Sequence, residues 1–263
     1  MIKPFFQHWN SIERSLKKKP IVLFLDFDGT LSPIVPKVED AYLPRVNQVE
    51  LKRLSKKLRG RVAIVSGRAL KDLKKKVGFK NFIYVGNHGL EIGGPHVRFK
   101  AAGAASARKV MAQIKKKLCH ELGSVHGIFL EDKDLTMSLH YRMVKGKDIP
   151  LVQRTFKKIV RPYVSKRQVK INPGKKVFEI KPPVNWHKGR AVRWLLSYWR
   201  RRAGKSFFPV YIGDDITDED AFAAVGRNGL GVVVGHTRPS KATFFVRDQK
   251  QVTTLLKKLA SLN

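Results

Sequence analysis

Two short acidic segments hold the residues of this 263-residue chain that are best suited to chemistry. The first, DFDGT at residues 26–30, follows an apolar run at residues 21–25. Here Asp26 can attack phosphorus as a nucleophile while Asp28 moves the proton of the leaving oxygen, which splits a hard hydrolysis into formation and breakdown of an aspartyl phosphate. A chance D-x-D in a surface turn and a calcium-binding loop are the alternatives, although a calcium loop needs a longer ligand series with a terminal Glu.

The second acidic segment, GDDITDED at residues 213–220, follows another apolar run. Carboxylates crowded together repel one another unless a cation compensates them, and hard oxygen ligands in a phosphate site suit Mg²⁺. Asp214 and Asp215 are the candidate ligands. The alternative is that the run forms the first turn of a helix, where the helix dipole stabilises negative charge, and Glu219 and Asp220 suit that position equally well.

Two smaller motifs lie between the acidic segments, SGR at residues 66–68 and Lys188 followed by Gly189. A phosphoryl group in transfer spreads its charge over its equatorial oxygens, so a hydroxyl, backbone N–H groups and an ammonium group around it stabilise the transition state. Ser66 and Lys188 fit these roles. Each motif alone also fits an ordinary turn or helix cap, or a solvent-exposed lysine.

Short apolar runs precede these motifs and predict the strands that must position them. Four runs, at residues 21–25, 62–65, 82–85 and 210–212, each end in a polar cluster, and helical patterns such as residues 51–58 separate them. Unbroken apolar strands of this kind indicate a parallel sheet buried on both faces. Because ligands of such sheets bind beyond the carboxyl ends of the strands, we expect the polar clusters to converge.

The middle of the chain departs from this pattern. We expect a helix near residues 110–122, strands at 127–131 and 135–142, a second helix at 149–159, and strands at 168–171 and 177–180 joined by a turn at Asn172–Lys175. The predicted fold class is therefore α/β, a Rossmann-like parallel-sheet hydrolase core with an inserted α+β (αββαββ) domain. The predicted boundaries are 1–99 and 183–263 for the core and 100–182 for the insert.

Charge, cysteine content and apolar runs limit the partners and the location expected for the protein. Lys and Arg number 54 against 20 Asp and Glu, a net charge of +34. Such a balance commonly accompanies nucleic-acid or anionic-membrane binding, but the basic triplets are scattered beside apolar core positions, which favours solvated faces and a field that attracts an anionic substrate. One cysteine, Cys119, permits neither an internal disulfide nor a cysteine-based metal site. Because the chain lacks a signal peptide and an apolar run of membrane length, we expect it to be cytoplasmic and to bind no membrane. From the scattered charge we expect no binding of nucleic acid. We also expect the protein to be a monomer.

The motifs DFDGT, SGR, KG and GDDITDED, in this order, resemble those of the haloacid dehalogenase superfamily of Mg²⁺-dependent phosphohydrolases. The resemblance implies that Asp26 is the nucleophile and that Asp28 is both the general acid/base and a metal ligand through its backbone carbonyl. It implies that Ser66 and Lys188 bind phosphate. The Mg²⁺ ligands implied are Asp26, Asp28, Asp214 and Asp215, with Asp218 beside them.

Longer stretches resemble one branch of that superfamily, the trehalose-6-phosphate phosphatase family. They are LFLDFDGTLSPIV, VAIVSGR, YVGNHGLEI, LEDKDLTMSLHYR, GKKVFEIKP and GDDITDEDAF. The resemblance implies that the inserted domain is a cap that closes over a sugar phosphate. The substrate-binding residues it implies are Thr30, Gly67, Arg68, His88, Gly89, Glu131, Lys133, Arg142 and Glu179. Taken alone, several of these have structural alternatives: a surface pair for Glu131 and Lys133, an exposed strand face for Glu179, and a backbone hydrogen bond for His88.

The sequence thus predicts a phosphatase that uses Mg²⁺ to hydrolyse trehalose 6-phosphate. Leu90, where the family commonly has a small residue, and the NWH segment before Lys188 depart from the pattern and bear on the sugar more than on the chemistry. One alternative is a phosphatase of another sugar phosphate, such as mannosyl-3-phosphoglycerate or sucrose 6-phosphate. An alternative of another class is a nucleic-acid-binding protein on an inactive phosphatase fold.

Overall fold

The structure is a computed structural model that describes residues 2–104, 106–174, 176–235 and 239–262. The chain divides into two compact units. Unit 1 combines residues 1–99 with residues 186–263, and unit 2 is the continuous segment 100–185. In the described part of the chain, no helix combines the length and apolar character needed to cross a membrane.

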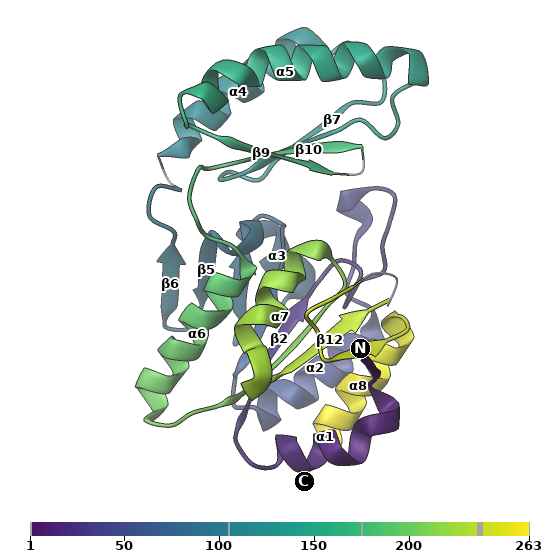
Figure 1. Cartoon of the computed structure of the whole chain (residues 1–263), viewed down its shortest axis with the longest axis vertical. Coiled ribbons are helices and arrows are strands. Elements are labelled where there is room, and N and C mark those ends of the chain that lie inside the picture. The colour runs from purple at the N-terminus through teal and green to yellow at the C-terminus, as the bar shows by residue number, and fades with distance from the viewer. Residues whose placement is uncertain (1, 105, 175, 236–238, 263) are drawn as a thin grey trace. The chain divides into compact units, whose positions relative to one another are not determined.

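Unit 1 is built on a large sheet in which nine described strands follow the order β1-β13-β12-β11-β2-β3-β4-β5-β6 (Figure 1). The pairs from β1 through to β4 are parallel, and β5 joins β4 antiparallel. The strands are β1 (Lys3–Pro4), β2 (Ile21–Asp26), β3 (Val62–Val65), β4 (Ile83–Gly86), β5 (Glu91–Gly94), β6 (Val97–Lys100), β11 (Phe208–Gly213), β12 (Leu230–Val234) and β13 (Phe244–Val246). The predicted parallel α/β fold is confirmed, and the short strands β1, β5 and β6 are additions to it.

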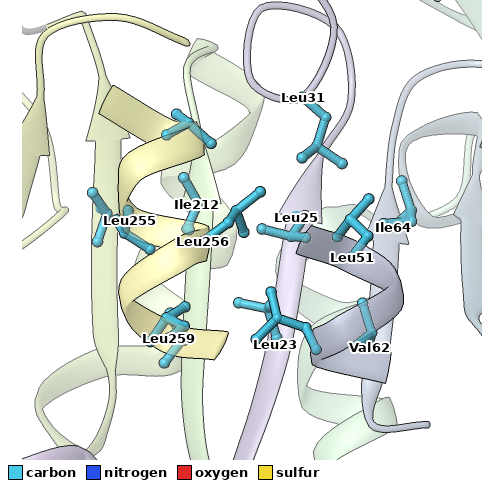
Figure 2. Packing of buried hydrophobic residues seen from close by; sticks show 14 of the residues in the cluster. Leu23, Leu25, Leu31, Leu51, Val62, Ile64, Ile212, Leu255, Leu256 and Leu259 are labelled. Carbon is cyan, nitrogen blue, oxygen red and sulfur yellow. The ribbon is translucent and has the colours of Figure 1, made fainter. Parts of the chain in front are cut away.

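Helices cover both faces of this sheet, as the unbroken apolar strands require. One face packs against α1 (Trp9–Leu16), α2 (Arg45–Lys57), α3 (Leu70–Val77) and α8 (Gln249–Ser261), and the other against α6 (Lys188–Ala203) and α7 (Glu219–Val225). Figure 2 shows the first face, where Leu255, Leu256 and Leu259 of α8 and Leu51 of α2 belong to one buried cluster with Leu23 and Leu25 of β2. Each fully buried side chain of this kind contributes about 1.5–3 kcal/mol.

Unit 2 is a four-stranded antiparallel sheet in the order β7-β8-β10-β9, with two helices on one face (Figure 1). Its elements are α4 (Ala107–Leu122), β7 (Phe129–Asp132), β8 (Met137–His140), α5 (Ile149–Ser165), β9 (Lys170–Gly174) and β10 (Val177–Lys181). Their order is the predicted αββαββ. Ile114 and Leu118 of α4 and Phe156 of α5 pack against Leu139 and Phe178 of the sheet.

The predicted antiparallel pairing of β9 with β10 is confirmed, but the bounds predicted for their turn, residues 172–175, are wrong. Strand β9 continues through this segment, because Asn172, Pro173 and Gly174 pair with Glu179, Phe178 and Val177 of β10. Pro173 is tolerated there because β9 lies at the edge of the sheet, where a missing N–H need not break a ladder. Lys175, the last residue of the predicted turn, lies outside the described residues.

Candidate active site

The polar clusters of unit 1 meet at one edge of the large sheet. Asp26 ends β2, Ser66 follows β3, Asn87 follows β4 and Gly213 ends β11, and these four strands are neighbours in the order β11-β2-β3-β4. Because the strands are parallel, their carboxyl ends share an edge. The chain thereby collects residues from distant segments at one place.

A buried ion pair network lies at the centre of this edge. The Lys188 ammonium donates to Asp26 Oδ1 and to Asp218 Oδ1, both at 2.7 Å, and the Tyr211 hydroxyl donates to Asp218 Oδ1 at 2.6 Å. Burial alone lowers the pKa of Lys188, but the neighbouring Asp218 and Asp26 carboxylates raise it above its ordinary value overall. For Tyr211 burial acts in the opposite direction and raises the pKa of the hydroxyl well above its ordinary value, and the Asp218 charge raises it further. Lysine is therefore the charged partner and tyrosine the neutral one.

Asp26 has an unusual electrostatic environment. Burial raises its pKa well above 3.8, the Lys188 charge opposes this, and the Asp218 and Asp214 charges add to it. A carboxylate this deep in the protein keeps its charge only with compensating cations. Lys188 is one such cation, and the crowding of carboxylates favours a second.

Three carboxylates come close enough together to hold a metal ion. One oxygen each from Asp26, Asp214 and Asp218, here called the acidic group, lies within 4.8 Å of the others. Burial raises the pKa of Asp214 to about 6, and the Asp218 charge contributes, which is the expected cost of crowding without a cation. A donor set made only of carboxylate oxygens suits Mg²⁺. The residues therefore fit the ion that the motifs imply.

The grouping differs from the ligand set expected from the sequence. Asp218, expected only beside the ion, supplies an oxygen to the group, whereas the side chains of Asp28 and Asp215 do not belong to it. Asp215 is exposed and caps the short 3-10 helix η5 (Ile216–Asp218), where its side chain accepts from a backbone N–H. The prediction for Asp28 concerned its backbone carbonyl as a metal ligand. A grouping of side-chain oxygens does not test that prediction.

Gly29 lets the two acidic segments approach each other. Its φ is +84°, and a Cβ on it would lie 2.1 Å from Asp214 Oδ2. The next residue, Thr30, donates from Oγ1 to Asp214 Oδ1 at 3.0 Å. Thr30, expected to bind substrate, thus holds the Asp214 carboxylate of the acidic group.

Asp28, whose side chain lies outside the acidic group, is held by Arg68. The Arg68 guanidinium donates from Nε to Asp28 Oδ2 at 2.7 Å and from Nη2 to Asp28 Oδ1 at 2.6 Å. It also donates to Asp72 Oδ2 and to the Val38 carbonyl, both at 2.9 Å. Burial alone lowers the pKa of Arg68, but the hydrogen bonds and charges of the two aspartates raise it overall. Arg68, expected to bind substrate, is therefore engaged inside the protein.

The loops after β3 and β4 hold each other in place. The Ser66 hydroxyl accepts from the backbone N–H of Arg68 at 3.1 Å, which leaves its proton available to a phosphate oxygen. The backbone N–H of His88 donates to the Ser66 carbonyl at 3.0 Å. A Cβ on Gly67 would lie 2.4 Å from His88 Nε2, so the imidazole packs directly over this glycine. Ser66, Gly67 and His88, all expected to bind substrate, thus form one contiguous group.

Close packing brings Lys188 into the site. Lys188 is the first residue of α6, and a Cβ on the following Gly189 would lie 2.1 Å from the Asp220 carbonyl, so α6 and α7 meet here without a side chain between them. A Cβ on Gly89 would lie 2.7 Å from the His187 carbonyl. Gly89, expected at the edge of the substrate, therefore also serves the packing of the α6 N-terminus.

In unit 2, strand register places two expected substrate residues in one row. Glu131 of β7 lies opposite Ser138 of β8, which in turn lies opposite Glu179 of β10. Directly opposed residues share a face of the sheet, and the neighbouring row with Leu139 and Phe178 packs against the helices. The Glu131 row therefore lies on the sheet face away from α4 and α5.

A lysine and a histidine neighbour Glu131 on that face. Lys133 Nζ lies 3.4 Å and His140 Nε2 3.0 Å from Glu131 Oε2. Burial acts to raise the pKa of Glu131, but His140 and Lys133 lower it overall, so this carboxylate is charged at neutral pH. Glu179 pairs with Lys181 at 2.6 Å, and Arg142 is exposed just after β8.

Sequence reasoning missed several residues that support the site. Tyr211 stands in an apolar strand, which suggests only core packing, although its hydroxyl holds Asp218. Gln249 Nε2 donates to the Gly29 carbonyl at 2.7 Å, and Asn47 Nδ2 donates to the Leu31 carbonyl at 2.9 Å, so α8 and α2 both secure the loop after β2. The one available signal was Asn47, an amide on the apolar side of a helix.

A family model described as Trehalose-phosphatase matches residues 24–250, which include every residue of the acidic group and of the Glu131 row. The chain belongs to the trehalose-phosphatase family. This confirms the resemblance seen in the motifs.

Individual relatives support the same family membership. A trehalose-phosphate phosphatase of Mycobacterium marinum is 34% identical over 245 residues, covering 91% of this chain and 61% of its own length. A probable trehalose-phosphate phosphatase 4 of Oryza sativa subsp. japonica is 32% identical over 257 residues, covering 95% of this chain and 69% of that protein. This chain therefore spans about three fifths of the mycobacterial relative's length. In fold it is similar to the C-terminal domain of a Candida albicans trehalose-6-phosphate phosphatase, with a TM-score of 0.80 and 21% identity over 100% of this chain and 99% of that one.

Proposed function

We propose that this protein is a Mg²⁺-dependent phosphatase that hydrolyses trehalose 6-phosphate to trehalose and phosphate through an aspartyl-phosphate intermediate. The observation that carries the proposal is the buried Asp26 carboxylate, placed among Lys188, Asp214 and Asp218 in a chain of the trehalose-phosphatase family. Family membership supports the substrate class, and the carboxylate and cation pattern supports the chemistry.

Within this proposal Asp26 attacks phosphorus, and its carboxylate oxygen forms the new bond while the ester oxygen leaves. Asp28 gives its proton to that oxygen and later takes one from the water that releases phosphate. The Lys188 ammonium and the Ser66 hydroxyl, with the backbone N–H of Gly67, stabilise the phosphoryl oxygens in transfer. Asp26, Asp214 and Asp218 would hold Mg²⁺, which supplies positive charge to those oxygens.

Unit 2 is the cap in this proposal and supplies the contacts to sugar. Ionised Glu131 and Glu179 accept from sugar hydroxyls, and Lys133 and Arg142 donate to them. A site that bonds each hydroxyl rejects sugars that leave its polar groups unpaired, because an unpaired buried group costs free energy. His88 and Gly89 would border this substrate on unit 1. A cytoplasmic monomer is part of the same proposal, and size-exclusion chromatography with light scattering tests the monomeric state.

The test is phosphate release from trehalose 6-phosphate, glucose 6-phosphate, sucrose 6-phosphate and mannosyl-3-phosphoglycerate, with Mg²⁺ or with EDTA. We expect turnover of trehalose 6-phosphate alone, abolished by EDTA and by Asp26→Asn. Glu131→Gln and Glu179→Gln should raise KM for that substrate, while the exposed helix residue Glu121, changed to Gln, serves as the matched control. Turnover of another sugar phosphate would overturn the substrate, and turnover by Asp26→Asn would overturn the mechanism.

A further inference from the structure

Arg68 has almost no capacity left for a substrate. A guanidinium has five N–H donors. Four of the five are used by the bonds to both Asp28 oxygens, to Asp72 and to the Val38 carbonyl. Bidentate recognition of a phosphate needs two parallel donors, and this side chain has only one to give.

The clamp on Asp28 is asymmetric. The Arg68 side chain is 5% exposed, whereas that of Asp28 is 42% exposed. The guanidinium carbon also lies 5.5 Å from the centre of the Phe27 ring. On the backbone, the N–H of Arg68 donates to Ser66 Oγ and its carbonyl accepts from Asn87 N–H at 2.7 Å. The arginine is thus fixed from all sides and the aspartate is the partner that reaches toward solvent.

We infer that Arg68 is a positioning residue that sets the orientation of the Asp28 carboxylate for proton transfer and is not a ligand of the substrate. The inference rests on the proposed phosphatase function. It concerns only residues of unit 1, whose mutual contacts the structure gives.

The chemistry explains why such a residue is useful. When the P–O bond to the sugar breaks and the bond from Asp26 to phosphorus forms, the Asp28 proton passes to the leaving oxygen. Asp28 becomes a carboxylate at that moment, the form that two guanidinium N–H groups bind. When water attacks and the Asp26–phosphorus bond breaks, the water proton returns to Asp28. Arg68 therefore interacts most strongly with Asp28 once the proton has left.

A leaving-group comparison separates this role from substrate binding. A sugar alkoxide needs a proton to leave, whereas the nitrophenolate of p-nitrophenyl phosphate leaves without one. Because both substrates share the later hydrolysis of the aspartyl phosphate, the comparison uses the single-turnover rate of leaving-group release. We expect Arg68→Ala to lower the rate of trehalose release from trehalose 6-phosphate by about 100-fold, the contribution typical of a general acid, and to change the rate of nitrophenolate release by less than about threefold. Asp28→Asn should give the same pattern, and the double variant should be no worse than Asp28→Asn alone.

Two further variants keep the experiment decisive. Arg68→Lys keeps the charge but loses the bidentate contact with Asp28. It should therefore show the same loss of rate on trehalose 6-phosphate alone, even if Arg68→Ala folds poorly. Arg53→Ala is the matched control, because Arg53 also donates to both oxygens of a buried carboxylate, that of Glu50. Both residues lie in α2 and neither belongs to the site. This variant should leave both activities unchanged.

Other outcomes would overturn the inference. A raised KM for trehalose 6-phosphate with kcat kept would make Arg68 a substrate ligand, and an equal loss on both substrates would make it a structural or phosphate-binding residue. The wild type tests the proposed function independently: if it hydrolyses a different sugar phosphate, that ester replaces trehalose 6-phosphate in the same comparison. A wild type without turnover of any phosphate ester overturns both proposals.

Discussion

Replacing Gly29 by alanine tests whether the approach of the two acidic segments matters for activity. The new Cβ would lie 2.1 Å from Asp214 Oδ2, where ordinary contact begins at 3.4 Å, so the carboxylate must move by more than an ångström. A side-chain end can rotate away cheaply, and we therefore expect the free energy of unfolding to fall only by the cost of a left-handed alanine, about 1–2 kcal/mol. Catalysis should suffer more, since a misplacement of about 1 Å can cost about 100-fold in rate.

Gly78→Ala is the control for this substitution. Gly78 has a nearly identical φ of +79°, but nothing lies within 4 Å of its Cβ position. Both variants should lose similar stability in thermal unfolding. Only Gly29→Ala should lose kcat/KM, by about 100-fold, and require more Mg²⁺ for half-maximal rate. If the two variants keep kcat/KM within about threefold of each other, the position of Asp214 is not what the activity depends on.

Three further predictions concern the buried network. Lys188→Met should lower the free energy of unfolding by about 3–5 kcal/mol in urea titrations, because it leaves Asp26 and Asp218 without their buried cation. Tyr211→Phe removes only the hydroxyl that holds Asp218 and should cost about 1–3 kcal/mol in the same assay. Because the folded protein raises the pKa of Asp214 from 3.8 to about 6, metal-free protein should be most stable below about pH 4 with respect to this group and lose that stability as pH rises through about 6. Thermal unfolding in EDTA should show the loss, and Asp214→Asn should reduce it.

Periodicity and strand-end position made much of the fold predictable. The runs that became β2, β3, β4 and β11 are apolar on both faces, as a strand covered by two helix layers must be, and the polar residues after them had to meet because parallel strands share an edge. The strands that were missed lack this signal. Lys3–Pro4 is only two residues long, and Glu91–Gly94 contains an acid and two glycines, which an apolar pattern does not detect.

The residue types of the site were predictable, but the pairing of its side chains was not. Asp218 follows Asp214 by four residues, and only the turn formed by η5 directs it back toward Lys188. Nothing in the sequence joins Arg68 to Asp28 across forty residues, because that contact depends on side-chain directions at the ends of two strands. The bounds of the turn at residues 172–175 were wrong for a related reason, since the pairing of Asn172, Pro173 and Gly174 with β10 outweighed local turn chemistry.

The strand order has a consequence for how the protein is made. β2 lies between β3, which follows it closely along the chain, and β11, which is translated only after the whole of unit 2. Unit 2 can complete its local antiparallel pairing during synthesis, while one edge of β2 waits for its neighbour and exposes unpaired backbone groups. The half-built sheet, more than the finished protein, is thus the species open to edge-to-edge aggregation. Basic residues outnumber acidic ones 54 to 20 over the whole chain, and such an excess of positive charge opposes association through mutual repulsion.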